Sequence, residues 1–265
     1  MNRPSIDSPF RSLIGMGEIQ AVYKQGMASK LSNAFGSLLF LLAGGYVLYY
    51  GLNYKNVYPD VAATNTPFIV GFALILIGAG GYWAWTLFSR WNEVAVLYQN
   101  GFAHFNGRDV TSFQWNDITS ITAKVTRMTV YHFIPAGTMR KYIFESPSAR
   151  LKLDGTLSGV DELVNQIRQN VFPIMVNRLS QELNAGKTLS FGPISISRTE
   201  GIRSKNKKYA WADVAGLRVV NGILEVVPKK KGLFGRISSD IGFIPNLDIL
   251  IALSTDMIRQ HNQNS

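Results

Sequence analysis

The sequence predicts an α+β protein that is anchored in a membrane by an N-terminal helical hairpin and carries two similar strand-rich units behind it. Two uncharged apolar runs cover Leu31 to Tyr54 and Val61 to Ser89. A strand-type alternation of apolar and polar residues begins soon after the second run. The same order of strands and one closing helix then occurs twice, which indicates an internal duplication.

Each apolar run is long enough to cross a hydrocarbon layer of about 30 Å as a helix, so residues 31–89 are predicted to form a transmembrane hairpin. Residues 1–30 are polar and are expected to form a flexible or loosely docked tail. Lys and Arg residues precede the first apolar run and follow the second, whereas the connecting loop holds only Lys55. The positive-inside rule therefore predicts an integral protein of the inner (plasma) membrane with both termini in the cytoplasm.

Glycine is frequent in both apolar runs. Gly44 and Gly51 are seven residues apart, as are Gly71 and Gly78, and this spacing returns each pair to one face of its helix. Small residues let helix backbones approach closely inside lipid. They can serve the packing of the hairpin on itself or the association with a further span. If all four glycines point into the contact between the two helices, no small-residue face remains for a partner.

Strand signals dominate the rest of the chain, and we divide it into a first repeat over residues 93–186 and a second repeat over residues 187–265. In each repeat a short strand leads to a Gly-apolar pair, and a Trp-x-Asp-Ile/Val motif opens a later strand. An amphipathic helix closes each repeat. The residues of the repeated motif are Gly101, Trp115 and Asp117 in the first repeat and Gly201, Trp211 and Asp213 in the second.

These motifs resemble those of bacterial PH-like domains. The whole chain resembles an uncharacterised group of bacterial membrane proteins with two spans and cytoplasmic PH-like repeats. The resemblance implies that each repeat is a bent antiparallel sheet with a helix that plugs one end. It implies no particular activity, because this fold hosts lipid binding, peptide binding and scaffolding alike.

The residues of the repeated motif are given a structural role. We predict that Trp115 and Trp211 are core residues rather than ligand-stacking residues. Asp117 and Asp213 are predicted to cap local backbone amides at a strand end or turn.

The positive charge of the chain, +10 in total, is concentrated in the second repeat, where twelve Lys and Arg face six Asp and Glu. One basic group lies in a predicted hairpin connection, and another surrounds a Gly-Leu-Phe-Gly segment. Such loops can place cations among lipid phosphates while apolar side chains enter the interface. The alternative is a solvated hairpin tip. The predicted contacts with anionic lipid are Arg203, Lys205, Lys207, Lys208, Lys229, Lys230, Lys231, Leu233, Phe234 and Arg236.

The sequence contains no catalytic motif, no cysteine and no histidines at metal-ligand spacing, so we predict neither an enzyme nor a cofactor or metal site. Aromatic residues are too sparse among the cations for a nucleic-acid surface. We therefore expect a membrane-anchored binding or scaffold module. Its expected partners are the bilayer, anionic lipid headgroups and an unknown membrane or cytoplasmic protein. The alternative is a structural subunit of a membrane complex that associates through its glycine-rich spans.

Overall fold

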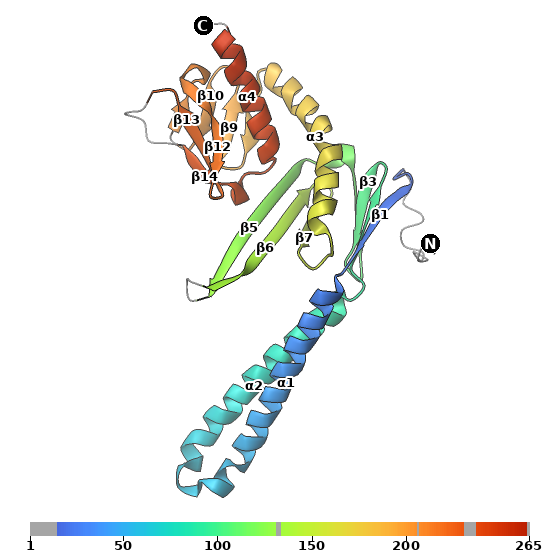
Figure 1. Ribbon diagram of the computed structural model, residues 1–265, viewed down its shortest axis with the longest axis vertical. Coiled ribbons are helices and arrows are strands. Elements are labelled where there is room, and N and C mark those ends of the chain that lie inside the picture. The colour runs from blue at the N-terminus through green and yellow to red at the C-terminus, as the bar shows by residue number, and fades with distance from the viewer. Residues whose placement is uncertain (1–14, 131–133, 206, 231–236, 264–265) are drawn as a thin grey trace.

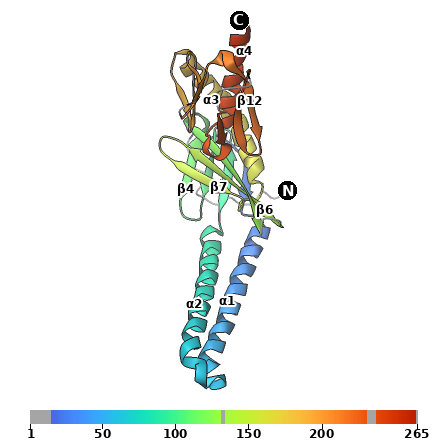
Figure 2. The same ribbon diagram turned by 90° about the vertical axis from the view of Figure 1, so that its left-hand side faces the viewer.

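The computed structural model describes residues 15–130, 134–205, 207–230 and 237–263. It is an α+β protein in which two long helices project from one end (Figure 1). The first repeat lies next to these helices, and the second repeat lies at the opposite end of the molecule. Figure 2 shows the same order of the three parts from the side.

The projecting hairpin consists of α1 (Met27–Val57) and α2 (Pro59–Arg90), which are separated only by Tyr58. Proline is well tolerated at the first position of a helix, and Pro59 begins α2. Both helices are long and apolar enough to span a membrane, with mean hydropathies of 1.6 and 1.8 over their apolar parts. Their large apolar side chains face outward to an unusual degree; Phe68, for example, is 77% exposed.

Four of the eight glycines in the hairpin lie at the contact between the two helices and allow them to pack closely. A Cβ atom on Gly44 would lie 2.7 Å from Ile77, and one on Gly80 would lie 2.8 Å from Leu41. Between them, the buried Ser37 hydroxyl donates to the Gly80 carbonyl over 2.9 Å. Gly36 and Gly51 are packed in the same way against α2, whereas a Cβ atom on Gly45, Gly71, Gly78 or Gly81 would meet nothing within 4 Å. The four glycines considered in the sequence therefore divide, with Gly44 and Gly51 inside the contact and Gly71 and Gly78 outside it.

The hairpin is inserted between the first two strands of the first repeat. Strand β1 (Ile19–Lys24) precedes α1 and pairs antiparallel with β2 (Val94–Tyr98), which follows α2. The prediction of a loosely docked tail is therefore wrong for β1, which belongs to the first repeat. The physical reason is that β1 gains its hydrogen bonds from a strand about 70 residues away, and a local pattern carries no sign of such pairing.

The first repeat contains a four-stranded antiparallel sheet in the order β1-β2-β3-β4 and a three-stranded antiparallel sheet in the order β5-β6-β7. A single helix, α3, closes it and continues without a break through Pro173. The remaining elements are β3 (Gly101–Phe105), β4 (Val110–Gln114), the 3-10 turn η1 (Trp115–Asp117), β5 (Ser120–Val130), β6 (Ile134–Glu145), β7 (Arg150–Asp154) and α3 (Val160–Asn184).

The second repeat has the same order of strands and closing helix without an inserted hairpin, and it has one additional 3-10 turn before the helix. Its sheets have the orders β8-β9-β10-β11 and β12-β13-β14, so all seven strands of the first repeat have counterparts. Its elements are β8 (Leu189–Phe191), β9 (Ile194–Ser197), β10 (Gly201–Ser204), β11 (Lys207–Tyr209), η2 (Trp211–Asp213), β12 (Val214–Val220), β13 (Ile223–Pro228), β14 (Ser238–Asp240), η3 (Ile241–Phe243) and α4 (Leu247–Gln263).

The two repeats share one continuous hydrophobic core and are joined by Asn246, which immediately precedes α4. The backbone N–H of Asn246 donates to the Ile121 carbonyl over 2.8 Å. Its side-chain Oδ1 accepts from the Ile121 N–H over 2.8 Å, and its Nδ2 donates to the Thr119 carbonyl over 2.9 Å. We call these three hydrogen bonds the Asn246 clasp. These hydrogen bonds attach the second repeat to β5 in the way that a paired residue of a neighbouring strand would.

Candidate functional site

A cavity of about 430 Å³ lies where α2 ends, between the last turns of that helix, the β3–β4 turn and β7. We call it the base pocket, because it lies at the base of the hairpin. Four cationic side chains line it against the single carboxylate of Glu93. The cations are Arg90, Arg108, Arg150 and Lys152, and the other polar lining residues include Ser89, Asn106 and Thr111.

The β3–β4 turn is shaped so that it rests on the end of α2. The Asn106 Oδ1 atom accepts hydrogen bonds of 2.9 Å from the backbone N–H groups of Arg108 and Asp109. Gly107 has a φ of +97°, and a Cβ atom there would lie 2.6 Å from the Ser89 carbonyl oxygen. Glycine is therefore required both by the left-handed backbone and by the close approach of the helix. The turn carries the Arg108 guanidinium to 5.8 Å from the centroid of the Trp85 ring on α2.

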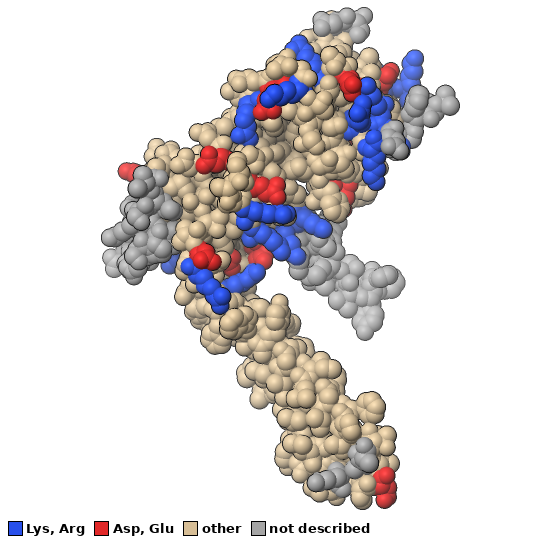
Figure 3. All heavy atoms as spheres, turned by 180° about the vertical axis from the view of Figure 1, so that it is seen from behind, with Lys and Arg blue, Asp and Glu red and all other residues tan. Residues whose placement is uncertain are grey.

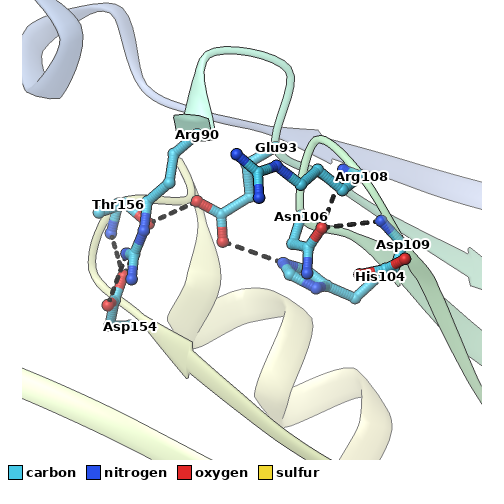
Figure 4. A network of polar contacts seen from close by, with 8 residues as sticks. All are labelled: Arg90, Glu93, His104, Asn106, Arg108, Asp109, Asp154 and Thr156. Carbon is cyan, nitrogen blue, oxygen red and sulfur yellow. Dashed lines mark hydrogen bonds and ion pairs between the residues drawn. The ribbon is translucent and has the colours of Figure 1, made fainter. Parts of the chain in front are cut away.

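The floor of the base pocket is a buried polar pair (Figure 4). The Glu93 Oε1 atom lies 2.9 Å from His104 Nε2, and both side chains are at most 6% exposed. The Thr156 hydroxyl lies 3.1 Å from the second oxygen of the same carboxylate. The single proton of the Thr156 hydroxyl also has Asp154 Oδ1 within 2.7 Å, so the contact with His104 is the one that holds the Glu93 carboxylate without competition.

An ion pair beside this floor ties α2 to β7. Arg90 Nη1 lies 3.1 Å from Asp154 Oδ2, while Thr156 donates to Asp154 Oδ1 from both its hydroxyl and its backbone N–H. Burial raises the pKa of the Asp154 carboxyl, but the hydrogen bonds from Thr156 and Arg90 together outweigh it, so this pKa lies below its ordinary value. The ionised carboxylate is therefore the form that the folded protein favours.

Replacement of Asp154 by asparagine is expected to lower the free energy of unfolding by about 1 kcal/mol at neutral pH, since charge-assisted hydrogen bonds are lost but the pair is partly solvated. Because the folded-state pKa is depressed, this stability is present above about pH 5 and is lost as the pH falls through the folded-state pKa. Thermal unfolding of the full-length protein in lipid nanodiscs should thus show a difference between wild type and Asp154→Asn that shrinks on acidification. The exposed Asp117, replaced by asparagine, is the matched control, and an equal effect there would contradict the assignment.

The chemistry of the base pocket suits the binding of an anion. Arg150 lies 3.2 Å from Glu145, but its side chain remains 70% exposed, and Arg90 is 47% exposed beside Asp154. Arginine guanidinium groups can donate to phosphate oxygens while they keep a carboxylate partner, because they carry five N–H groups. Among the residues that the structure describes, no group of three His, Asp or Glu side chains is placed to hold a metal ion.

The sequence-predicted lipid contacts lie in the second repeat, at the end of the molecule away from the helices. Figure 3 shows Lys and Arg gathered in two regions, one next to the hairpin and one over the second repeat. Arg203 and Lys208 both pair with Glu200, over 2.9 and 3.5 Å. The Lys229 ammonium donates to Asn262 over 2.7 Å. Lys205 and Lys207 line a cavity of about 500 Å³ beside β14, Lys230 is exposed, and Lys231, Leu233, Phe234 and Arg236 lie outside the described residues.

The sequence did not predict the base pocket, because its four cations come from three separate elements. Arg90 ends α2, Arg108 lies in the β3–β4 turn, and Arg150 and Lys152 lie on β7. No run of charge marks them, and the overall charge of this part of the sequence is close to zero. The one available signal is the Asn106-Gly107 pair, which indicates a turn between strands but no ligand.

The repeated tryptophans have the same contacts in both repeats. Trp115 Nε1 donates to the Gln99 carbonyl and Trp211 Nε1 to the Ser197 carbonyl, each over 2.9 Å. Both rings are buried in the core. The indole N–H therefore fixes the corner between the two sheets, and neither ring is available for stacking on a ligand.

The repeated aspartates differ from the prediction. Asp117 and Asp213 are exposed, and within the described part of the chain neither carboxylate accepts a hydrogen bond, so the prediction of a capping role is wrong. The 3-10 turn instead provides its own partner, since the Asp213 N–H donates to the Ala210 carbonyl over 3.0 Å. The Val214 N–H likewise donates to the Trp211 carbonyl, so these two amides of the second turn do not need the Asp213 side chain.

The fold and the base pocket define a class of α+β proteins in which a long apolar helical hairpin is inserted into the first of two similar β-rich repeats. The chain belongs to a family of unknown function, DUF6585, whose model matches residues 10–264. No curated protein and no solved structure matches the chain.

Proposed function

We propose that this protein is a membrane-anchored binding module that holds an anionic lipid headgroup in the base pocket, on the cytoplasmic side of the membrane. The observation that carries the proposal is the position of four cationic side chains around one cavity at the end of two apolar helices. If the hairpin is inserted in a bilayer, the lipid headgroups lie at the level of the base pocket. The proposal includes no chemical conversion of the lipid.

The exposure of the hairpin supports insertion into a bilayer. Large apolar side chains on both helices face outward, including Phe35 at 68% and Ile75 at 69% exposure. In water this surface would be unfavourable by about 25 cal/mol per Å², whereas hydrocarbon removes that cost. Trp85 and Trp91 lie near the end of α2, and the Lys30 ammonium lies 4.5 Å from the Trp91 ring centroid. Tryptophan and lysine are typical of the headgroup level.

The base pocket is a better candidate for headgroup binding than the second repeat. In Figures 1 and 2 the first repeat separates the second repeat from the helices. Attraction between a cation and a charged leaflet fades within a Debye length of about 8 Å at physiological salt. Basic residues at the far end of the molecule are therefore poorly placed to contact the membrane that holds the hairpin.

The second repeat is better suited to a protein partner. Each repeat has four strands in one sheet, three in another and one helix, an arrangement expected of PH-like domains, which include scaffolds as well as lipid and peptide binders. The Asn246 clasp and the shared core fix the second repeat to the first. We infer that the second repeat presents its basic surface to a cytoplasmic protein while the first repeat stays at the membrane.

Lipid retention tests the headgroup proposal. Full-length protein is released from nanodiscs with equal amounts of phosphatidylglycerol and phosphatidylcholine, and native mass spectrometry counts the lipids that remain bound. We expect wild type to retain phosphatidylglycerol preferentially. Three substitutions in the base pocket should reduce that retention about tenfold, since each cation near an anionic lipid contributes roughly 1 kcal/mol but some of it is already used in ion pairs. They are Arg108→Gln, Arg150→Gln and Lys152→Gln.

A second triple variant provides the control, because it removes the same charge from the second repeat. It carries Arg203→Gln, Lys205→Gln and Lys208→Gln, and we expect it to retain phosphatidylglycerol like wild type. A loss of phosphatidylglycerol retention in this variant alone would mean that the headgroup site lies in the second repeat. Equal retention of the two lipids by wild type would refute headgroup binding altogether.

A second candidate function, a structural subunit of a membrane complex, is supported by the glycines that face away from the hairpin contact. Gly71 and Gly78 share one face of α2, and a Cβ atom on either would meet nothing within 4 Å. Close helix packing in lipid uses such faces.

The double substitution Gly71→Leu and Gly78→Leu is expected to lower the associated fraction of the full-length protein several-fold in bilayers, because leucine prevents close backbone approach. Energy transfer between labelled copies measures that fraction. Gly45→Leu, an outward glycine on α1, is the matched control and should have little effect. If wild type shows no association at any protein density, the outward glycines do not mediate association between copies of this chain.

A further inference from the structure

The hairpin of β5 and β6 extends far beyond the third strand of its sheet. Strand β7 pairs only with residues 141–145 of β6, whereas β5 and β6 stay paired as far as Val130 and Ile134. We call residues 125–130 and 134–140 the projecting ribbon. In Figures 1 and 2 the β5–β6 hairpin points toward the end of the molecule from which the helices project, and its far end reaches the level at which α1 begins.

The register of the projecting ribbon gives it two unlike faces. Alternate residues of a strand lie on opposite faces of a sheet, and residues paired directly across two strands lie on the same face. On one face of the ribbon four of six residues are apolar and none is charged, and these four are Met128, Val130, Ile134 and Met139. We call it the apolar face. The opposite face carries Arg127 and Arg140.

The apolar face lies on the side of the sheet away from α3. At the base of the ribbon α3 is bound on the opposite face, where the Tyr142 hydroxyl donates to Asp161 over 2.7 Å and Arg140 pairs with the same carboxylate. By register, the apolar face instead continues the face that carries Arg150 and Lys152, which are exposed and line the base pocket. The outward face of an antiparallel sheet is normally polar. Apolar residues on this face therefore indicate a cover on the side where α2 ends.

A pair of lysines lies where the apolar face begins. Lys124 is paired directly with Lys141, and like charges in such positions destabilise a sheet. The Lys124 ammonium lies 5.2 Å from the Phe243 ring centroid. On its other side Lys141 is paired with Asp154, whose carboxylate accepts from Arg90 at the end of α2. Cations next to an apolar surface are typical of segments that lie in the headgroup region of a membrane, where phosphates offset the repulsion.

We propose that the projecting ribbon is a second membrane contact, with its apolar face in the interface of the leaflet that the helices enter and with Lys124 and Lys141 among the lipid phosphates. An isolated two-stranded ribbon is marginally stable in water, so contact with the leaflet stabilises it. The β6 residues of the ribbon have no partner on β7, and such backbone groups need the water of the interface rather than the hydrocarbon core.

This inference rests on the proposed insertion of α1 and α2, but not on headgroup binding in the base pocket. A protein held by both the helical hairpin and the projecting ribbon has two separate points of contact with one leaflet. These two contacts fix the orientation of the first repeat relative to the membrane.

Single nitroxide labels test the proposal, and the chain contains no cysteine that would interfere. The full-length protein is placed in nanodiscs with equal amounts of phosphatidylglycerol and phosphatidylcholine. Collision of each label with oxygen, which concentrates in lipid, is compared with collision with a water-soluble nickel complex. The labelled variants are Val130→Cys and Met139→Cys on the apolar face and Thr129→Cys on the opposite face. The lipid reference is Leu74→Cys on α2, which is 58% exposed, and the water reference is Asn221→Cys at an exposed turn.

We expect the ratio of oxygen to nickel collisions at positions 130 and 139 to approach that at position 74 and to exceed that at position 221 several-fold. The ratio at position 129 should be lower than that at position 130. Position 139 decides by itself if Val130→Cys does not fold.

Three results overturn the proposal. Water-like ratios at positions 130 and 139 beside a lipid-like ratio at position 74 would show that the helices are inserted but the ribbon is not. Few collisions with either reagent at positions 130 and 139 would show that protein covers the apolar face. Equal ratios at positions 129 and 130 would contradict the assignment of that face. A water-like ratio at position 74 would refute the insertion of the helices, and the inference would be lost with it.

Discussion

Replacing Gly201 with alanine is expected to lower the melting temperature of the protein by about 10 °C, which corresponds to a loss of about 3 kcal/mol or more. Gly201 has a φ of +89°, a region that costs a residue with a Cβ atom roughly 1–2 kcal/mol. The added Cβ atom would also collide with the Tyr209 carbonyl oxygen on β11. That strand would have to move out of the sheet to make room.

Gly216→Ala is the matched control for this change. Gly216 lies on β12 in the same repeat, and a Cβ atom there would meet nothing within 4 Å. We expect its melting temperature to stay within about 2 °C of wild type, since a half-buried strand position with open space beside it tolerates alanine. Thermal unfolding of the full-length variants, followed by circular dichroism, makes the comparison. Equal effects of the two substitutions would show that the close approach of β11 does not explain the glycine.

Asn246→Ala is expected to separate the unfolding of the two repeats and to destabilise the protein by about 3 kcal/mol. The change removes two side-chain hydrogen bonds of the clasp, each worth about 1 kcal/mol, and leaves the Ile121 N–H without its partner. Asn246 also has a φ of +52°, where alanine is less favourable than asparagine. Hydrogen exchange should accelerate at Ile121, and we expect two thermal transitions where the shared core of the wild type predicts one.

Asn221→Ala is the control that separates the cost of the left-handed backbone from the loss of the clasp hydrogen bonds. Asn221 has the same φ of +52° but lies at the exposed β12–β13 turn, away from the first repeat. It should therefore show only the backbone cost, about 1 kcal/mol. If Asn246→Ala and Asn221→Ala have equal effects and exchange at Ile121 stays slow, the clasp does not join the repeats.

The hairpin and the repeated motif could be predicted because their causes are local. A run such as Leu31 to Tyr54 shows its length and lack of charge directly, and α1 and α2 enclose both predicted runs. Gly101 and Trp115 are fourteen residues apart and Gly201 and Trp211 ten, yet the motif recurs because each glycine lies against a carbonyl oxygen of the next strand and each indole makes the same hydrogen bond.

The aspartates show the limit of such local patterns. A motif position indicates that a residue recurs, but not what its side chain contacts. For Asp213 the backbone of the 3-10 turn already supplies the hydrogen bonds that the carboxylate was predicted to provide. In the second repeat the prediction was wrong because it assumed that the amides of the turn had no backbone partner.

By itself, the sequence determined that this protein has two long apolar helices and two strand-rich units built on one motif. Periodicity and charge record these features residue by residue. Only the tertiary structure decided that β1 belongs to the first repeat, that Arg90, Arg108 and Lys152 converge on one pocket, and that Asn246 joins the repeats. Each of these depends on contacts between segments that lie far apart in the chain, and those contacts are set by how the sheets pack rather than by neighbouring residues.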